Sequence, residues 1–443
     1  MKCLYIILIG FFFINAYSQK TKKVSVAIPR GNMLSYAKPS EVGLDSLYIH
    51  TQVDKIIANG IAKEAFPGAQ ILVAKQGRII FHKAYGYHTY DKKQAVSLND
   101  LYDIASVTKI TAALPAIMKL VDEKKLDLDA PFSDYWEPWR KIPNKKKLTL
   151  REILAHQAGL QPYIVFLSKL YKKNGKLKKR FVKTRTSDRF SNQAYEGIYI
   201  KNKFRKKMYR DIDRSPVSNE RKYKYSGLSF LIFPELVEQL SGSDFEGYLK
   251  HHFYLPLKAN TLGFLPKKRR FANKIVPTEQ DTSFRKTLTQ GWVHDENASL
   301  LGGISGNAGL FASATDLAKI MQMYMQYGTY GGKRYLSEAT VKEFIKLQYP
   351  QHKNRRGLGF DKPYLNNSEL SLSKAYPAPE VSAESFGHSG FTGTFVWADP
   401  EHELVYIFLS NRVYPTRAQR NIYNLNIRPA VQQVFYNASL SRN

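Results

Sequence analysis

A serine and a lysine three residues apart could together generate a nucleophile. Ser106 and Lys109 lie in the segment SVTK, and residues i and i+3 at the start of a helix share one face. The lysine amine can therefore reach the serine hydroxyl. Burial favours the neutral form of a lysine amine, which can take the hydroxyl proton while the serine attacks a carbonyl. The spacing thus indicates covalent acyl transfer through Ser106.

The same spacing also has an ordinary structural explanation, in which Ser106 caps a helix and Lys109 is a solvated charge. A lysine-rich chain contains such pairs by accident, and the polar segment 371–374 holds one. The residues from Lys109 to about Glu123 are apolar nearly all round, which predicts a buried helix. A solvated lysine fits badly there, so the context favours the catalytic interpretation.

Two later segments carry groups that could complete such a site. Tyr225 lies directly before an apolar helix expected over 228–241 and offers a hydroxyl for proton transfer. His388, Ser389 and Gly390 lead into a strand, where glycine lets the backbone approach a ligand closely. An edge strand there could bind an extended peptide by strand addition. Packing alone explains each segment equally well.

The N-terminus resembles a secretory signal peptide. An apolar run over 4–14 follows a short positive start, and Ala16 and Ser18 are small residues where a signal peptidase reads. We expect a signal peptide over 1–18, export across the inner membrane and a periplasmic location. No later segment is apolar enough to span a membrane. Because Cys3 is the single cysteine, the mature chain would have no thiol catalysis, disulfide or thiolate metal site.

Charge is distributed unevenly along the chain. The formal net charge is +30, which points to an anionic surface or ligand. Half of this excess lies in residues 169–224, which hold twenty Lys or Arg residues against five Asp or Glu residues. A secreted chain without a recognisable nucleic-acid-binding module is not expected to bind nucleic acid.

Strand signals lie near both ends of the chain, and helical signals lie between them. Strands are expected at 70–75, 78–84, 393–399 and 404–410, and helices at 41–66, 149–158, 228–241 and 417–436. This order predicts an α/β (α+β) fold, with one antiparallel sheet built from both chain ends and flanked by helices.

The expected domain limits follow from this order. Residues 19–40 are polar and are expected to form a tether before a single domain over 41–443. A helical lobe is expected over about 101–290, with a basic insert over 165–224 inside it. The insert is either a solvated loop or an electrostatic docking surface for the anionic cell envelope.

Taken in chain order, these pieces resemble the serine β-lactamases and D,D-peptidases, the penicillin-binding-protein type of serine hydrolase. The motifs are Ser-x-x-Lys at 106–109, Tyr-Ser at 225–226 and His-x-Gly at 388–390. The segments LREILAHQAGL (150–160) and GGISGNAGLFASATDLAKI (302–320) are also similar. The resemblance covers about residues 42–435 and is greatest to Bacteroidetes chains with a His-x-Gly-Phe-Thr-Gly segment. It implies the β-lactamase/transpeptidase-like fold.

The resemblance also implies a role for each matching residue. Ser106 would be the nucleophile, Lys109 its activator, and Tyr225 the group that passes a proton to the leaving group. The backbone N–H groups of Ser106 and Phe391 would form the oxyanion hole. The reaction would need no metal ion and no cofactor.

The substrate-facing positions include one departure from the family. His388 stands where many members have lysine, and Ser389 and Gly390 beside it would contact the substrate. Gly227, also expected in the substrate site, occupies the third position of the family's Tyr-x-Asn motif. It has no amide to hold Lys109 or a substrate amide, which counts against efficient β-lactam hydrolysis more than against the nucleophile.

The resemblance implies hydrolysis of an amide or ester through a covalent acyl-enzyme. D-amino-acid peptides of peptidoglycan are the leading substrates, as for a D,D-carboxypeptidase or endopeptidase, with esters second and β-lactams third. A function of another class stays open, in which a non-catalytic protein binds cell-wall peptides in the same cleft.

Overall fold

The structure is a computed structural model that describes residues 32–220, 222–269, 271 and 274–439. The predicted signal peptide and the predicted tether up to residue 31 lie outside the described residues. The end of that tether is not free, because Ser35–Tyr36 forms strand β1. This strand pairs in parallel with β3 (Arg78–Gly86), so the tether prediction is wrong for these two residues.

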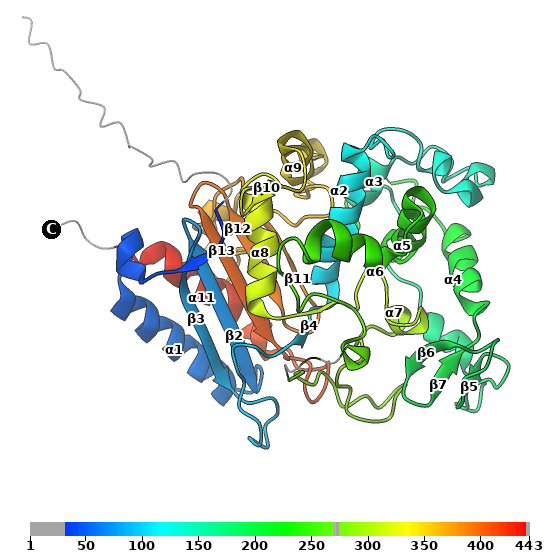
Figure 1. The fold of residues 1–443 in the computed structure, drawn as a ribbon, viewed down its shortest axis with the longest axis horizontal. Helices are drawn as coiled ribbons and strands as arrows, with labels where there is room; N and C mark the ends of the chain where they lie inside the picture. Colours follow the sequence, from blue (N-terminus) through cyan, green and yellow to red (C-terminus); the bar gives the residue numbers. More distant parts are fainter. Residues whose placement is uncertain (1–31, 221, 270, 272–273, 440–443) are drawn as a thin grey trace, which may run out of the picture.

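A six-stranded sheet is built from the two ends of the domain, as the sequence predicts (Figure 1). Its strand order is β1-β3-β2-β13-β12-β11, and every pairing after β1–β3 is antiparallel. The remaining strands are β2 (Gly68–Lys75), β11 (Phe386–Ser389), β12 (Phe395–Asp399) and β13 (Leu404–Ser410). The predicted antiparallel sheet is therefore confirmed, with one parallel strand added at its edge.

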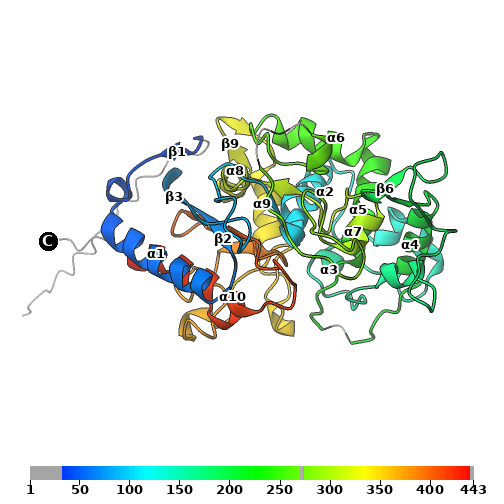
Figure 2. The same cartoon turned by 90° about the horizontal axis from the view of Figure 1, so that it is seen from below.

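Helices cover both faces of the sheet. Helices α1 (Ser46–Ala62) and α11 (Ile427–Asn437) lie on the outer face, whereas α8 (Ala314–Met325) lies on the inner face (Figures 1 and 2). Neighbouring β13 residues, such as Tyr406 and Ile407, point into the two opposite hydrophobic cores. Burial on both faces explains why the central strands have continuous apolar sequences.

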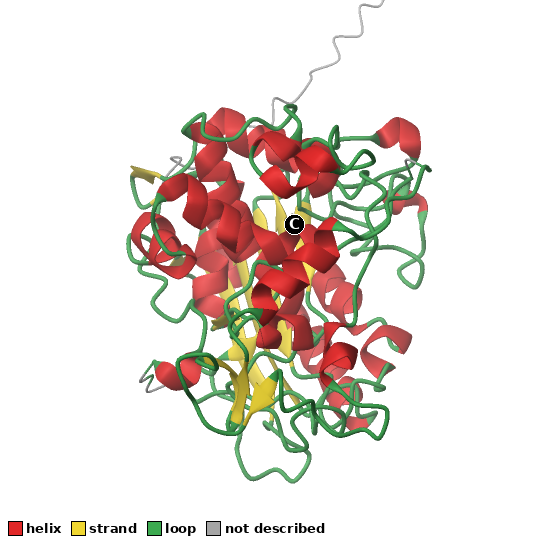
Figure 3. Cartoon of the chain, turned by 90° about the vertical axis from the view of Figure 1, so that its right-hand side faces the viewer, coloured by secondary structure: helices red, strands yellow, loops and turns green. Residues whose placement is uncertain are grey.

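The helical lobe packs beside the inner face of the sheet, in front of the strands in Figure 3. Its helices are α2 (Leu114–Asp122), α3 (Leu150–Leu154), α4 (Phe204–Asp213), α5 (Leu228–Ser241), α6 (Phe245–Leu249) and α7 (Glu296–Leu300). Helices α9 (Glu338–Ile345) and α10 (Asn421–Asn424) complete the set of named α-helices. Within the described part of the chain, no helix is long and apolar enough to cross a membrane.

The basic insert contains regular secondary structure and is not a loop throughout. It contains α4 and a three-stranded sheet of β5 (Val182–Lys183), β6 (Asn192–Tyr195) and β7 (Ile198–Ile200). The indole N–H groups of Trp136 and Trp139 both donate to Asp213 at the end of α4, at 2.8 and 3.0 Å. Several of its aromatic residues are buried, and Phe204 and Tyr209 join the hydrophobic core of the lobe.

Candidate active site

Ser106 lies in a short turn of non-α geometry. A 3-10 turn, Ala105–Val107, is followed by a π-helical segment, Lys109–Ala113, before α2 begins. The backbone of Ala105 is left-handed, with φ of 46°, which costs energy in a residue other than glycine. The Asp103 carboxylate holds it by accepting from its N–H at 2.8 Å. The predicted helix thus begins in a strained form, and π-helical segments are frequent at functional sites.

The Lys109 amine is buried and faces the Ser106 hydroxyl. Nζ donates to Ser106 Oγ at 3.0 Å and to the backbone carbonyl of Asn307 at 2.9 Å, and Lys109 is 2% exposed. Nζ also lies 5.5 Å from the ring centres of Tyr225 and Phe230. The structure therefore brings the predicted Ser106–Lys109 pair together beside Tyr225. Asn307, which the sequence did not single out, supplies the additional acceptor for the lysine.

Tyr225 is positioned by His156, a residue of the segment LREILAHQAGL. The His156 carbonyl accepts from Lys224 N–H at 3.0 Å, and His156 Nδ1 accepts from Ser226 N–H at 3.3 Å. The rings of His156 and Tyr225 are 4.5 Å apart, and the ring of His388 lies 6.2 Å from Tyr225. His156 therefore fixes the backbone on both sides of Tyr225, a positioning role that the sequence did not reveal.

His388 lies on β11 and is a neutral acceptor. Its Nδ1 is 2.7 Å from the Ser389 carbonyl, which can only accept, so Nδ1 carries the ring proton. Nε2 is buried and has no hydrogen-bond partner among the described residues. Burial, aided by the charge of Arg356 and opposed by Asp361, lowers the pKa of His388 to about 3. The imidazole is therefore uncharged at physiological pH.

A buried ion pair lies close to Tyr225 and His388. Arg356 is 1% exposed and pairs with Asp361, and its guanidinium lies 5.6 Å from the ring centre of Tyr225. Burial alone would raise the pKa of Asp361, but Arg356 and Arg355 hold that pKa well below its ordinary value. The carboxylate therefore stays charged and keeps the two arginines in place.

The edge of the sheet reaches the turn that carries Ser106. Thr394 Oγ1 donates to the Ile104 carbonyl at 3.1 Å, and a Cβ on Gly390 would lie 2.5 Å from the same carbonyl oxygen. Gly390 is therefore required for this close approach. The approach brings Phe391 to the cavity that Ser106 also lines. The two residues predicted to supply the oxyanion hole thus lie at one site.

The edge of β11 is less open than strand addition requires. The backbone of Asp361 exchanges two hydrogen bonds with Gly387, at 2.8 and 3.0 Å. An extended peptide would therefore find only a short free edge, around Ser389.

Gly227 leaves an open space at the start of α5. Its φ of −91° suits any residue, and no atom lies within 4 Å of the position that a Cβ would take. Its N–H donates to the Pro162 carbonyl at 3.2 Å. A side chain would fit here, and none is present to contact Lys109 or a substrate.

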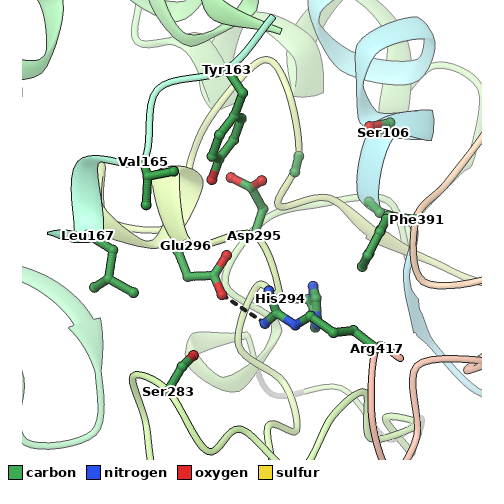
Figure 4. Close-up of a pocket in the computed structure, with 12 residues that line it drawn as sticks. Ser106, Tyr163, Val165, Leu167, Ser283, His294, Asp295, Glu296, Phe391 and Arg417 are labelled. Carbon is green, nitrogen blue, oxygen red and sulfur yellow. Dashed lines mark hydrogen bonds and ion pairs between the residues drawn. The ribbon is translucent and has the colours of Figure 1, made fainter. Parts of the chain in front are cut away.

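A cavity of about 550 Å³ opens beside Ser106. Figure 4 shows Tyr163 and Val165 on one side and Ser106 with Phe391 on the other. The cavity is also lined by Leu167, Asp295, Glu296 and Arg417, and neither Tyr225 nor His388 lines it. No sequence pattern marked these lining residues, because they come from segments that are far apart in the chain.

Comparisons with known proteins agree with this architecture. The family model described as Beta-lactamase matches residues 53–428. A Salmonella enteritidis protein named "Putative D-alanyl-D-alanine carboxypeptidase" is 28% identical over 428 residues, which covers 90% of this chain and 91% of that protein.

Two solved structures share the fold at low sequence identity. A penicillin-binding protein homologue from Caulobacter crescentus has a TM-score of 0.60 at 18% identity and covers 87% of this chain and 97% of its own. EstCE1, a hydrolase with promiscuous acyltransferase activity, has a TM-score of 0.60 at 17% identity. The match covers 87% of this chain and 98% of EstCE1. With the match of the family model to most of its length, this chain belongs to the β-lactamase family and is a serine hydrolase with the β-lactamase/transpeptidase-like fold.

Proposed function

We propose that Ser106 attacks a substrate carbonyl and forms a covalent acyl-enzyme that water then hydrolyses. The observation that carries this proposal is the 3.0 Å contact between the buried Lys109 amine and the Ser106 hydroxyl. Lys109 takes the hydroxyl proton as the Oγ–carbon bond forms. Tyr225 delivers a proton to the leaving group as its bond breaks and regains one from the Lys109 ammonium, so both groups return to their starting state. The N–H groups of Ser106 and Phe391 stabilise the oxyanion between these two events.

We further propose that the substrates are D-amino-acid peptides of peptidoglycan. The Salmonella relative carries the name of an enzyme for such peptides, and it aligns with nearly the whole chain. The signal-like N-terminus would direct the protein to the periplasm, where peptidoglycan lies. Cleavage would follow the acyl-enzyme path, with the D-amino acid or the remainder of the peptide as leaving group.

An ester is the second candidate substrate, and the neutral state of His388 favours it. A lysine at this position would offer a positive charge to the free carboxylate of a terminal D-amino acid. The pKa of His388, lowered by burial to about 3, leaves no such charge. A leaving group without a charge, such as an alcohol or an internal amide, loses less free energy on entering these surroundings.

A small substrate panel separates these candidates. Purified protein is incubated with an acylated D-alanyl-D-alanine dipeptide, an internally linked peptide and a neutral umbelliferyl ester, with Ser106→Ala as control. Release of the terminal D-alanine supports the carboxypeptidase proposal, and turnover of the ester alone supports the second candidate. Reversible binding of the peptide without turnover of any substrate would contradict both and identify a non-catalytic binding protein.

We also propose that the basic insert contacts an anionic surface of the cell envelope. Lys172, Lys173, Lys176 and Lys179 are all exposed along one turn-rich segment of the insert. Each lysine near an anionic surface contributes about 1 kcal/mol at most, and salt weakens this attraction. The insert also borders the site, because Val165 lines the cavity beside Ser106.

A further inference from the structure

The cavity beside Ser106 has apolar walls. Tyr163, Val165 and Phe391 are 41%, 59% and 45% exposed, which is unusual for large hydrophobic side chains. They lie on opposite sides of the cavity in Figure 4. Exposed apolar surface beside a nucleophile indicates where an apolar part of a substrate packs.

An acidic group lies among these walls. The Asp295 carboxylate points toward the Tyr163 hydroxyl (Figure 4). Both hydrogen bonds that hold it, from Ala298 N–H at 2.8 Å and from the Asn307 amide at 3.2 Å, reach Oδ1. Among the described residues, no lysine or arginine forms an ion pair with this carboxylate, so Oδ2 is available to a ligand. Burial, and then the charges of Asp295 and Glu296, raise the pKa of Tyr163 far above its ordinary value.

Arg417 does not cancel this negative charge. Its guanidinium donates to Glu279 at 2.6 Å and to Glu296 at 2.8 Å, so two carboxylates share one cation. Burial raises the pKa of Glu279, but the hydrogen bonds from His294 and Arg417 have the larger combined effect. The pKa of Glu279 is therefore lowered to about 2. With Asp295 beside this group, the cavity favours a cation, although the chain as a whole has a net charge of +30.

The cavity lies on the acyl side of the bond to be cleaved. In the mechanism proposed above, Tyr225 and His388 face the leaving group, and neither of them lines the cavity. Ser106 and Phe391, which would hold the carbonyl, lie at its edge. The part of the substrate that enters the cavity is therefore the part that remains on Ser106.

We propose that this cavity selects an acyl group whose aliphatic stem ends in a protonated primary amine, with Asp295 as the residue that determines this specificity. The inference rests on the proposed acyl-enzyme mechanism. The stem packs between Val165 and Phe391, and the ammonium group pairs with Oδ2 of Asp295. The side chain of a lysine or of another diamino acid in a cell-wall peptide has this chemistry.

A pair of isosteric esters tests the selection directly. The 4-methylumbelliferyl esters of 6-aminohexanoic acid and heptanoic acid differ by an ammonium in place of a methyl group. We expect kcat/KM to favour the amine by about fivefold at low salt, as for a partly exposed ion pair of about 1 kcal/mol, and the ratio to fall toward one in Asp295→Asn. A ratio near one in the unaltered protein, or a preference retained in Asp295→Asn, would overturn the proposal.

Two further variants serve as controls for this test. Asp295→Ser keeps a hydroxyl that can cap α7 but removes the charge. If Asp295→Asn folds poorly, Asp295→Ser can be measured in its place. Glu401→Gln removes one exposed charge from the β12–β13 turn and is expected to keep the full preference. Loss of the preference in Glu401→Gln would mean that long-range charge, not Asp295, sets the selection, and would overturn the proposal.

Binding measurements distinguish failure of this inference from failure of the mechanism. Calorimetry on Ser106→Ala compares 6-aminohexanamide with heptanamide, so no turnover is needed. Tighter binding of the amine that disappears in Ser106→Ala/Asp295→Asn supports the cavity even if neither ester is hydrolysed. Equal affinities would overturn it even if both esters are hydrolysed through Ser106.

Discussion

The two sides of the candidate site are built differently. On the side proposed to be catalytic, called the catalytic side below, hydrogen bonds hold residues that lie on or next to helices and strands, namely Ser106, Lys109, Tyr225 and His388. On the cavity side, the lining residues come from the start of the basic insert, the beginning of α7 and loops that are far apart in the chain. The first side suits a reaction with any carbonyl, whereas the second suits selection among acyl groups. Chemistry and selectivity should therefore respond to different substitutions.

The largest effect is expected on the catalytic side. Lys109→Ala and Tyr225→Phe should each slow acylation by about 10²–10⁴-fold for every substrate, because each removes a proton-transfer group. Since both serve one proton path, the double variant should lose far less than the product of the two effects. Single-turnover kinetics with a neutral ester measures all three variants. Strictly multiplicative losses would show that the two groups act separately.

Substitutions in the insert should weaken binding to an anionic surface and leave the rate of hydrolysis unchanged. Replacing Lys172, Lys173, Lys176 and Lys179 by Gln should weaken binding to anionic vesicles by about tenfold or more at low salt, from about 1 kcal/mol at most per lysine. Lys178 is left in place because its amine donates to the Lys169 carbonyl at 2.9 Å. Hydrolysis of a small neutral ester should be spared. Vesicle co-sedimentation at increasing ionic strength provides the measurement.

A matched control variant replaces four exposed lysines outside the insert, namely Lys55, Lys63, Lys92 and Lys124. It removes the same net charge and should bind vesicles more tightly than the insert variant does. Equal weakening in the two variants, or binding that salt does not change, would refute a docking role for the insert.

The burial of His388 predicts how stability depends on pH. Its folded pKa of about 3 lies below the ordinary value of 6.5, so the unfolded state binds more protons between these values. Stability should therefore fall as the pH drops from 6.5 toward 3. Between pH 7 and pH 5, the unaltered protein should lose about 1–2 kcal/mol more than His388→Asn, measured by urea unfolding. An equal loss in the unaltered protein and in His388→Asn would refute the neutral buried imidazole.

The smallest effect is expected at Gly227. Gly227→Asn should fold normally, because no atom lies within 4 Å of the new Cβ position. An amide there should raise cephalosporin turnover relative to a neutral ester by about threefold to tenfold, the value of one hydrogen bond. Steady-state kinetics with both substrates gives the ratio. An unchanged ratio would mean that the cavity side alone sets the selectivity.

The catalytic side could be predicted because its signals are local. Ser106 and Lys109 lie within one helical turn, and Tyr225 and His388 each adjoin an element that its apolar residues mark. The cavity side could not be predicted, because packing of distant loops brings residues such as Asp295 and Arg417 together. Asn307 was missed for another reason, since it holds Lys109 through a backbone carbonyl, which no side-chain pattern reveals.

The fold could be predicted where an apolar run is long, as in β2, β13 and α5. Strand β1 was missed because two residues, Ser35–Tyr36, are too few to show a period. The strands and the helix of the insert were not predicted, because abundant lysines and arginines obscure the pattern of the aromatic residues that are buried there. The left-handed Ala105 was missed although its N–H donates to Asp103 only two residues earlier, because an aspartate accepts such a local bond in many kinds of turn.

Covalent labelling followed by peptide mapping tests the central claim most directly. A fluorophosphonate probe should modify the unaltered protein at Ser106, and Ser106→Ala should take up no label while keeping its far-ultraviolet spectrum. The matched control is Ser371→Ala, which disrupts the other Ser-x-x-Lys segment and should label fully. Label that persists in Ser106→Ala, for example at Ser389, would contradict the assignment of Ser106 as the nucleophile.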